Sequence, residues 1–325
     1  MSENLASIKK FLKTDQDRYK NTLTKIISSN VFLIDNISRY IIRHKGKGLR
    51  PLLVLLSARL LGQPNEKTYQ VASIVELLHT ATLIHDDVVD EAIVRRGFPS
   101  INAIWKNKIS VLMGDYLLAK SLISATETGQ MQIMKTLAET SKRLSKGELL
   151  QIEKSRKLDI TESEYLKIIS DKTAALISAC CELGAMTVSE SEQEIDILRK
   201  YGENLGMAFQ IKDDLLDYEG NQTLLGKPVG ADIKEKKITL PLILSLKNAP
   251  DKEKKIIMKL VKKGAEQGDI KRIFEFISTY GGINEANAYV NNYANQAREN
   301  IISLKESPAK EHALNFVDYI VTRKK

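Results

Sequence analysis

Cysteines are scarce in this sequence: its 325 residues include only two, Cys180 and Cys181, which are adjacent. Neighbouring cysteines are poorly placed to join distant segments, so the sequence predicts no disulfide framework and favours a reducing compartment. Long apolar runs are also missing, because the longest, 52–61, is interrupted by Ser57 and Arg59 and is too short to span a bilayer. The first residues form no apolar core of the kind a signal peptide has. We therefore expect a soluble, cytoplasmic protein in which the two cysteines are small packing residues.

Aromatic residues make up only 6% of the chain, whereas 49 basic and 41 acidic residues give a net charge of +8. A basic balance can indicate a nucleic-acid or membrane-surface partner. No basic run with interleaved aromatic residues supports nucleic-acid binding, and we expect none. A mixed surface with excess lysine is the simpler interpretation of the charge.

Strand-like alternation is rare, and helical periodicity runs through most of the chain. Apolar residues recur at three- and four-residue spacing in several segments, namely 66–90, 109–126, 161–183 and 192–219. Thr161 with Glu164, and Ser189 with Glu192, have the spacing of capping boxes and predict helix starts. No glycine- or serine-rich linker divides the chain. The sequence therefore predicts an all-α fold in which residues 1–325 form one large domain of helices packed around a centre.

One acidic pattern occurs twice: Asp-Asp-Val-Val-Asp at 86–90 and Asp-Asp-Leu-Leu-Asp at 213–217. In a helix, Asp86 and Asp90 lie one turn apart on the same face, where like charges destabilise by roughly a few tenths of a kcal/mol. A bound cation would offset this cost. Magnesium is typically held by one or two carboxylates, with water and substrate phosphates as its other ligands. A single copy is more often a solvated acidic turn, but two matched copies on apolar helices favour a magnesium site.

Basic residues lie close to both acidic clusters. They comprise Lys45, Lys47 and Arg50 before a helix expected to start at Pro51, Arg95 and Arg96 directly after the first cluster, and Lys227, Lys236 and Lys237 after the second. Arginine suits bidentate phosphate contacts, and lysine acts as a point charge. Each patch alone is more often a solvated loop. Their alternation with two metal-type clusters favours a diphosphate site.

The motifs that contain these residues resemble those of trans-isoprenyl diphosphate synthases. They are GKGLRP, ELLHTATLIHDDVVDEAIVRRG, GDYLLAKS, DKTAAL, FQIKDDLLDY and GKPVGADIKEKKITLP, in the family's order, and the RKK ending at 323–325 is similar to the family's basic tail. The motifs span residues 46–241, about 60% of the chain. The resemblance implies a helical bundle of the isoprenoid synthase type with a central active-site cavity. It also implies a prenyltransferase that joins isopentenyl diphosphate to an allylic diphosphate, with three Mg²⁺ per active site.

The resemblance assigns roles to matching residues. The metal ligands would be Asp86, Asp90, Asp213 and Asp217, supported by Asp87 and Asp214. The allylic diphosphate would contact Arg95, Lys172, Lys237 and Lys227, with Thr173 and Gln210 near the developing carbocation. Isopentenyl diphosphate would contact Lys47, Arg50, His79 and Arg96. The expected catalytic residues are Asp86, Asp87, Asp90, Asp213, Asp214, Lys172 and Lys237.

Two of these assignments depend strongly on the resemblance. By itself, His79 is better explained as a histidine at the edge of the core, and only its family position favours a substrate contact. Gly48 departs from the family's pattern, because many members carry a basic residue there. The contacts to isopentenyl diphosphate therefore stay open, although its identity as the second substrate does not.

Ala81 and Thr82 bear on product length, because they lie within about one turn of Asp86, where a growing prenyl tail would descend. Short-chain members of the family place aromatic residues at one or both positions, and small residues here leave the path open. Close helix packing is the alternative explanation for small residues. By resemblance we expect about six to ten isoprene units (about C30–C50), most simply an octaprenyl product for quinone side chains. Candidates for the tunnel floor, which the sequence does not rank, are Ile74, Leu78, Leu118, Met134 and Leu137.

Other functions stay open to different degrees. A shorter-chain farnesyl or geranylgeranyl synthase, or the catalytic subunit of a heteromeric synthase, fits the same motifs. A silent subunit or a terpene cyclase fits less well, because both aspartate motifs and GKGLRP are complete. A polyanion-binding scaffold leaves the paired aspartates unexplained. Family members are commonly homodimers, so we expect a homodimer, with 109–126 as a candidate interface, and a lipophilic product suggests transient association with a membrane surface.

Overall fold

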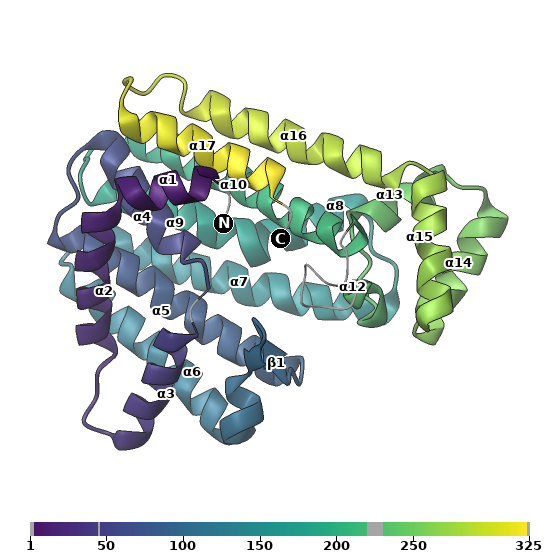
Figure 1. The fold of residues 1–325 in the computed structure, drawn as a ribbon, viewed down its shortest axis with the longest axis horizontal. Helices are drawn as coiled ribbons and strands as arrows, with labels where there is room; N and C mark the ends of the chain where they lie inside the picture. The colour runs from purple at the N-terminus through teal and green to yellow at the C-terminus, as the bar shows by residue number, and fades with distance from the viewer. Residues whose placement is uncertain (1–2, 45, 220–229, 324–325) are drawn as a thin grey trace.

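The computed structural model describes residues 3–44, 46–219 and 230–323, which are almost entirely helical (Figure 1). The N-terminal half contains α1 (Glu3–Phe11), α2 (Lys13–Ile27), α3 (Phe32–Arg43), α4 (Leu49–Leu61), α5 (Glu66–Val89), the two-residue strands β1 (Val94–Arg95) and β2 (Phe98–Pro99), α6 (Ile101–Glu127) and α7 (Met131–Lys157). The C-terminal half contains α8 (Glu162–Ile169), η1 (Ser170–Ala174), α9 (Ala175–Met186), α10 (Glu192–Glu219), α12 (Ala231–Lys234), α13 (Leu240–Asn248), α14 (Asp251–Lys263), α15 (Gln267–Thr279), α16 (Gly282–Asn300) and α17 (Pro308–Thr322). The all-α prediction is confirmed; β1 and β2 form a small antiparallel hairpin.

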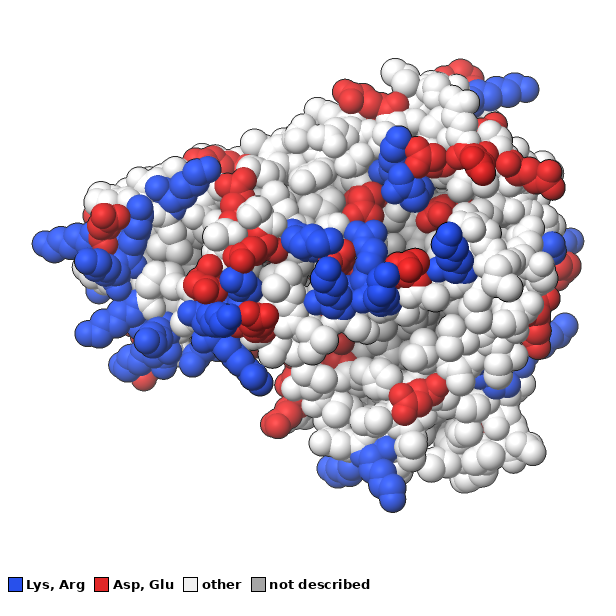
Figure 2. Space-filling view, turned by 180° about the vertical axis from the view of Figure 1, so that it is seen from behind, with Lys and Arg blue, Asp and Glu red and all other residues white. Residues whose placement is uncertain are grey.

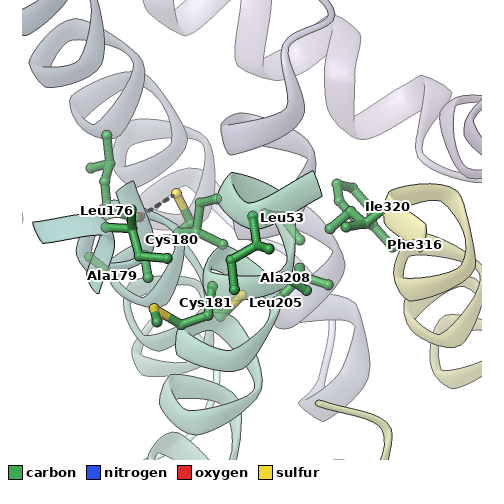
Figure 3. Close-up of a cluster of buried hydrophobic side chains, with 14 of the residues drawn as sticks. Leu53, Leu176, Ala179, Cys180, Cys181, Leu205, Ala208, Phe316 and Ile320 are labelled. Carbon is green, nitrogen blue, oxygen red and sulfur yellow. Dashed lines mark hydrogen bonds between the residues drawn. The ribbon is translucent and has the colours of Figure 1, made fainter. Parts of the chain in front are cut away.

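The centre of the core lies where α4, α9, α10 and α17 meet (Figure 3). Leu53, Cys180 and Leu205 come from three of these helices and are all fully or almost fully buried. Cys180 and Cys181 are both free, as the sequence predicts, and each fills a small space between helices. Burial raises the pKa of Cys181 to about 12, so its thiol stays protonated at neutral pH.

Two local expectations about helix starts are corrected. The helix after the GKGLRP motif begins at Leu49 rather than Pro51, because Gly48 adopts a left-handed conformation (φ 67°) and starts the helix two residues earlier. Ser189 is not the N-cap of α10: the Glu194 N–H donates to Ser191 Oγ at 3.3 Å, while Ser189 Oγ donates to the Glu194 carboxylate at 2.6 Å. A run of serines offers alternative caps, and tertiary context selects one. The predicted box at Thr161 is present.

The long helix α6 is apolar on two faces. Its inner face buries Met113 and Leu117, whereas Leu112 and Ile123 on its outer face are 59% and 54% exposed. Within the described ranges it is the single helix long and apolar enough to cross a membrane, and 39% of its most apolar 18-residue stretch is buried. One face of α6 packs along α5 (Figure 1), and its opposite face carries an exposed apolar stripe.

Candidate active site

The first acidic cluster lies at the end of α5. Asp86 is in the last turn and Asp90 is the C-cap residue, while the hairpin β1–β2 turns the chain back so that Arg95 pairs with the buried Asp87. Burial raises the pKa of Asp86 to about 6; the nearby carboxylates of Glu148 and Asp90 add to this effect, and Lys172 opposes it. Desolvated carboxylates crowded together in this way favour a bound cation.

The second cluster lies near the end of α10, and its three aspartates have different surroundings. The side chain of Asp213 is half exposed (53%) and lies 2.5 Å from the Arg323 guanidinium, at the end of α17. Asp214 is buried, and it accepts hydrogen bonds from Tyr165 Oη at 2.6 Å and Gln210 Nε2 at 2.7 Å. Burial and the nearby Asp232 raise the pKa of Asp214 well above its ordinary value. Asp214 therefore anchors α10 internally, and Asp213 is the more accessible carboxylate.

A π-helical turn, η1, interrupts the helix expected over 161–183 and presents Lys172 and Thr173. Arg143 of α7 holds this turn: its guanidinium lies 2.9 Å from Asp171 and 2.9 Å from Glu203, and it donates to Ser170 Oγ at 2.8 Å. Several charge-assisted hydrogen bonds on one guanidinium fix the turn firmly. Positioning of Lys172 therefore depends on residues distant in sequence.

Gly147 of α7 lies directly against this turn. A Cβ at residue 147 would lie 2.8 Å from the backbone nitrogen of Lys172 and 3.1 Å from the carbonyl carbon of Asp171. Because the obstructing atoms belong to the backbone, they cannot rotate away as a flexible side chain would. The close approach of α7 to η1 therefore requires glycine at this position.

A chain of hydrogen bonds joins the residues expected around the allylic substrate. Thr173 Oγ1 donates to Gln210 Oε1 at 2.7 Å, and the Gln210 amide in turn donates to Asp214. These side chains line a cavity of about 150 Å³, together with Lys172 and Lys237. Lys172 also pairs with Glu148 at 2.5 Å. The structure thus brings Lys172, Thr173, Gln210 and Lys237 to one cavity.

Of the residues expected to hold isopentenyl diphosphate, Arg50 and His79 are in contact, whereas Lys47 is bonded to a different helix. Arg50 donates through one terminal nitrogen to His79 Nε2 at 2.9 Å, so that nitrogen of the imidazole is an acceptor. Burial, Arg50 and Arg96 lower the pKa of His79 well below its ordinary value. The buried Nε of Arg50 has no hydrogen-bond partner among the described residues, so its N–H could donate a hydrogen bond to an anion. Lys47 points elsewhere, donating to Tyr319 Oη of α17 at 2.9 Å.

A larger hollow of about 1160 Å³ opens beside the small cavity, and both are lined by Gln151, Ser155, Lys236 and Lys237. The hollow extends from Asp90 to the lysines of α14. Figure 2 shows one group of lysine and arginine side chains in the middle of its view and another over the end that α14 and α15 form, at the left.

Magnesium fits the donor set of the two clusters. Within the described ranges, no three His, Cys, Asp or Glu side chains lie close enough together to hold a metal ion by themselves. The available donors are carboxylates on two separate helices, and magnesium accepts a few such oxygens while phosphates and water supply the rest. Asp86, Asp90, Asp213 and Asp217 are therefore suitable ligands for ions shared with a bound diphosphate.

One predicted site residue is not described by the structure, and several residues of the site were not predicted from the sequence. Lys227, expected to contact the allylic diphosphate, lies outside the described residues. Sequence analysis missed Arg143, Glu148 and Tyr165, whose partners are 24 to 60 residues away, and no local signal marks them. Arg323 belongs to the RKK ending, which the sequence did single out.

Known proteins resemble this chain in sequence and structure. A family model described as polyprenyl synthetase matches residues 32–277. The short chain isoprenyl diphosphate synthase of Methanothermobacter thermautotrophicus is 32% identical, with 99% of each chain covered. The octaprenyl diphosphate synthase of Escherichia coli is 31% identical over 98% of this chain and 99% of its own. The structure of a polyprenyl synthase from Caulobacter crescentus CB15, complexed with calcium and isoprenyl diphosphate, has a TM-score of 0.92 and 34% identity, covering 99% of this chain and 98% of its own.

Proposed function

The chain belongs to the polyprenyl synthetase family and is a prenyltransferase, and from this premise we propose that it is a magnesium-dependent all-trans-polyprenyl diphosphate synthase. The observation that carries the proposal is the pair of aspartate clusters on α5 and α10: Asp90 of the first lines the 1160 Å³ hollow, Asp214 of the second lines the adjoining 150 Å³ cavity, and Lys236 and Lys237 line both. The calcium and isoprenyl diphosphate in the Caulobacter structure agree with a site for a divalent ion and a diphosphate.

In the proposed reaction, the bond between the allylic carbon and the diphosphate oxygen breaks, and a new carbon–carbon bond forms to isopentenyl diphosphate. Magnesium, about three ions by family resemblance, would neutralise charge on the departing diphosphate. Lys172, Lys237 and Arg95 would hold that diphosphate where its negative charge develops. By the family resemblance, the hydroxyl of Thr173 and the side-chain carbonyl of Gln210 would stabilise the positive allylic carbon, and the departing diphosphate would accept the proton that is lost.

The second substrate would be held by Arg50, Arg96, His79 and Lys47. The unpartnered Nε of Arg50 supports this assignment, since an incoming diphosphate would satisfy it. A neutral His79 can donate or accept one hydrogen bond without adding charge. Holding the double bond close to the allylic carbon supplies the proximity that such a condensation requires.

For the product we propose a medium or long chain of about six to ten isoprene units, with octaprenyl the central value. Ala81 is buried and small, and Thr82 lies beside it, so neither of these two positions places an aromatic ring beneath Asp86. The named relatives include both an octaprenyl and a short-chain synthase, so a farnesyl or geranylgeranyl product is the alternative. A catalytic subunit of a heteromeric enzyme is a second alternative.

We further propose a cytoplasmic homodimer of a single domain per chain, which supplies quinone side chains and associates transiently with membranes. The apolar stripe of α6, with Val111, Leu112 and Ile123 exposed, supports an interface there. This stripe contains part of the 109–126 segment that the sequence suggested.

Product analysis tests the proposal. Purified protein with Mg²⁺, farnesyl diphosphate and labelled isopentenyl diphosphate should give mainly products of seven or more units by the family expectation, resolved by chromatography after dephosphorylation. Products of fifteen or twenty carbons would retain the enzyme class and refute the open path.

The double variant Asp86→Ala, Asp213→Ala should lose turnover, whereas Asp17→Ala, on the exposed face of α2, should not. Full turnover in the double variant would refute the site.

A further inference from the structure

The helix α14 carries an unusual concentration of positive charge. Its 13 residues include six lysines and two acidic residues, a net +4 against +8 for the whole chain. Among the described residues, only Lys254 of these six lies within ion-pair distance of a carboxylate, Asp251, at 3.4 Å. Lysines one turn apart, such as Lys255 and Lys259, repel each other and destabilise a helix by roughly 0.2–0.5 kcal/mol per pair.

Five of the six lysines of α14 lie on one side of the helix, and Lys254 lies outside this group. Ile257 and Val261 are buried against the rest of the protein. Lys255, Lys259 and Lys262, at positions i, i+4 and i+7, line the 1160 Å³ hollow, and Lys252 and Lys263 are exposed beside them. α14 is thus an amphipathic helix whose apolar side is already covered and whose basic side is open.

This basic side continues to the mouth of the active site, by which we mean the part of the 1160 Å³ hollow beside Asp90. The hollow is lined by seven lysine and arginine residues against three acidic ones, and it includes Asp90 of the first acidic cluster. Val89, which is 56% exposed, adds an apolar edge to the same lining.

From these observations we propose that the lysine side of α14 docks the enzyme on a bilayer surface that carries anionic lipid headgroups. Charge complementarity supports this partner, because each lysine near such a surface contributes about a fivefold factor to binding. The size of the patch also fits: α14 extends about 20 Å, longer than one diphosphate and wide enough for several headgroups. The inference rests on the proposed function, since docking on this face would turn the mouth toward the membrane that receives a prenyl product.

Vesicle binding of the full-length protein, measured without substrates, tests the proposal. The test variant is Lys255→Gln, Lys259→Gln, Lys262→Gln, Lys263→Gln, which lowers the net charge by four without touching the active-site residues. The matched control changes four exposed lysines elsewhere, Lys13, Lys25, Lys135 and Lys305, to glutamine. Flotation would be compared for vesicles of phosphatidylcholine mixed with phosphatidylglycerol and vesicles of phosphatidylcholine alone.

We expect the unchanged protein to bind the phosphatidylglycerol vesicles only, with an affinity that falls as salt rises. The α14 variant should bind more than about tenfold more weakly and the control within about twofold of the original, given the fivefold factor per lysine. Turnover with soluble substrates should be the same in all three proteins, which keeps this test separate from that of the proposed function.

Three results would overturn the proposal. The unchanged protein could ignore anionic vesicles, or the two variants could lose binding equally, which would make total charge the cause. Alternatively, the α14 variant could keep vesicle binding but raise the KM for isopentenyl diphosphate at low salt. The lysines would then steer soluble diphosphates into the hollow instead of docking a bilayer.

Discussion

Replacing Gly147 with alanine should damage catalysis through the π-helical turn without touching a substrate. The added Cβ would lie 2.8 Å from the backbone nitrogen of Lys172, closer than real Cβ atoms approach their neighbours, so α7 or η1 must move. Overpacking of this kind costs about 1–3 kcal/mol. Alanine also favours a helix interior over glycine by about 1 kcal/mol, so the net loss of unfolding free energy should be about 0–2 kcal/mol.

The effect on turnover should be larger than the effect on stability. Lys172 and Thr173 are fixed by η1, and a displacement of about 1 Å in a catalytic group can lower the rate about a hundredfold. We expect kcat of Gly147→Ala to fall about tenfold to a hundredfold, with a native helical circular-dichroism spectrum. Urea unfolding and steady-state kinetics with farnesyl and isopentenyl diphosphates would measure the two quantities.

Gly268 provides the matched control for this experiment. It lies in the first turn of α15, and a Cβ there would meet nothing within 4 Å apart from the neighbouring backbone of its own helix. Gly268→Ala should keep full turnover and gain up to about 1 kcal/mol of unfolding free energy. If Gly147→Ala behaved in the same way, α7 and η1 would not be closely packed in solution, and the positioning role of the turn would be refuted.

Three further outcomes are expected. In the folded protein, burial lowers the pKa of His79 below the 6.5 of the unfolded chain, so its stabilising contribution is complete above pH 6.5 and is lost as pH falls. The unfolding free energy of His79→Gln should therefore fall less steeply below pH 6.5 than that of the original protein. Urea titrations at several pH values would measure both slopes, and identical slopes would contradict this expectation. Ala81→Phe should shorten the products by placing a ring beneath Asp86, and an unchanged chromatographic profile would mean that the tail takes another path. EDTA should abolish turnover while leaving the helical spectrum intact, because the fold is held by a hydrophobic core that includes none of the proposed metal ligands; activity persisting without divalent ions would refute the metal requirement.

Local patterns were sufficient for much of the architecture. The apolar spacing over 66–90 and 192–219 predicted helices that the structure has at Glu66–Val89 and Glu192–Glu219. The motif around Asp86 and its repeat at Asp213 identified the two clusters, because side-chain spacing along one helix is set by the backbone itself. The resemblance assigned the family, which the comparisons confirm.

Positions that depend on distant partners could not be predicted in this way. The sequence gives no sign that a π turn would divide 161–183, since the turn is held by Arg143, whose side chain arrives from another helix. Nor does it show that Arg323 pairs with Asp213, 110 residues away, or that α14 lies at the rim of the hollow.

The sequence by itself determined which segments are helical, where the acidic clusters fall and what chemistry they offer, because these properties arise within a few residues of chain. Tertiary structure alone decided that Asp214 is an internal anchor bonded to Tyr165, that Lys172 is presented by a turn packed closely against Gly147, and that the lysines of α14 line the same hollow as Asp90. Those relations arise from packing between helices far apart in sequence, where burial and complementary charge, rather than local periodicity, select the arrangement.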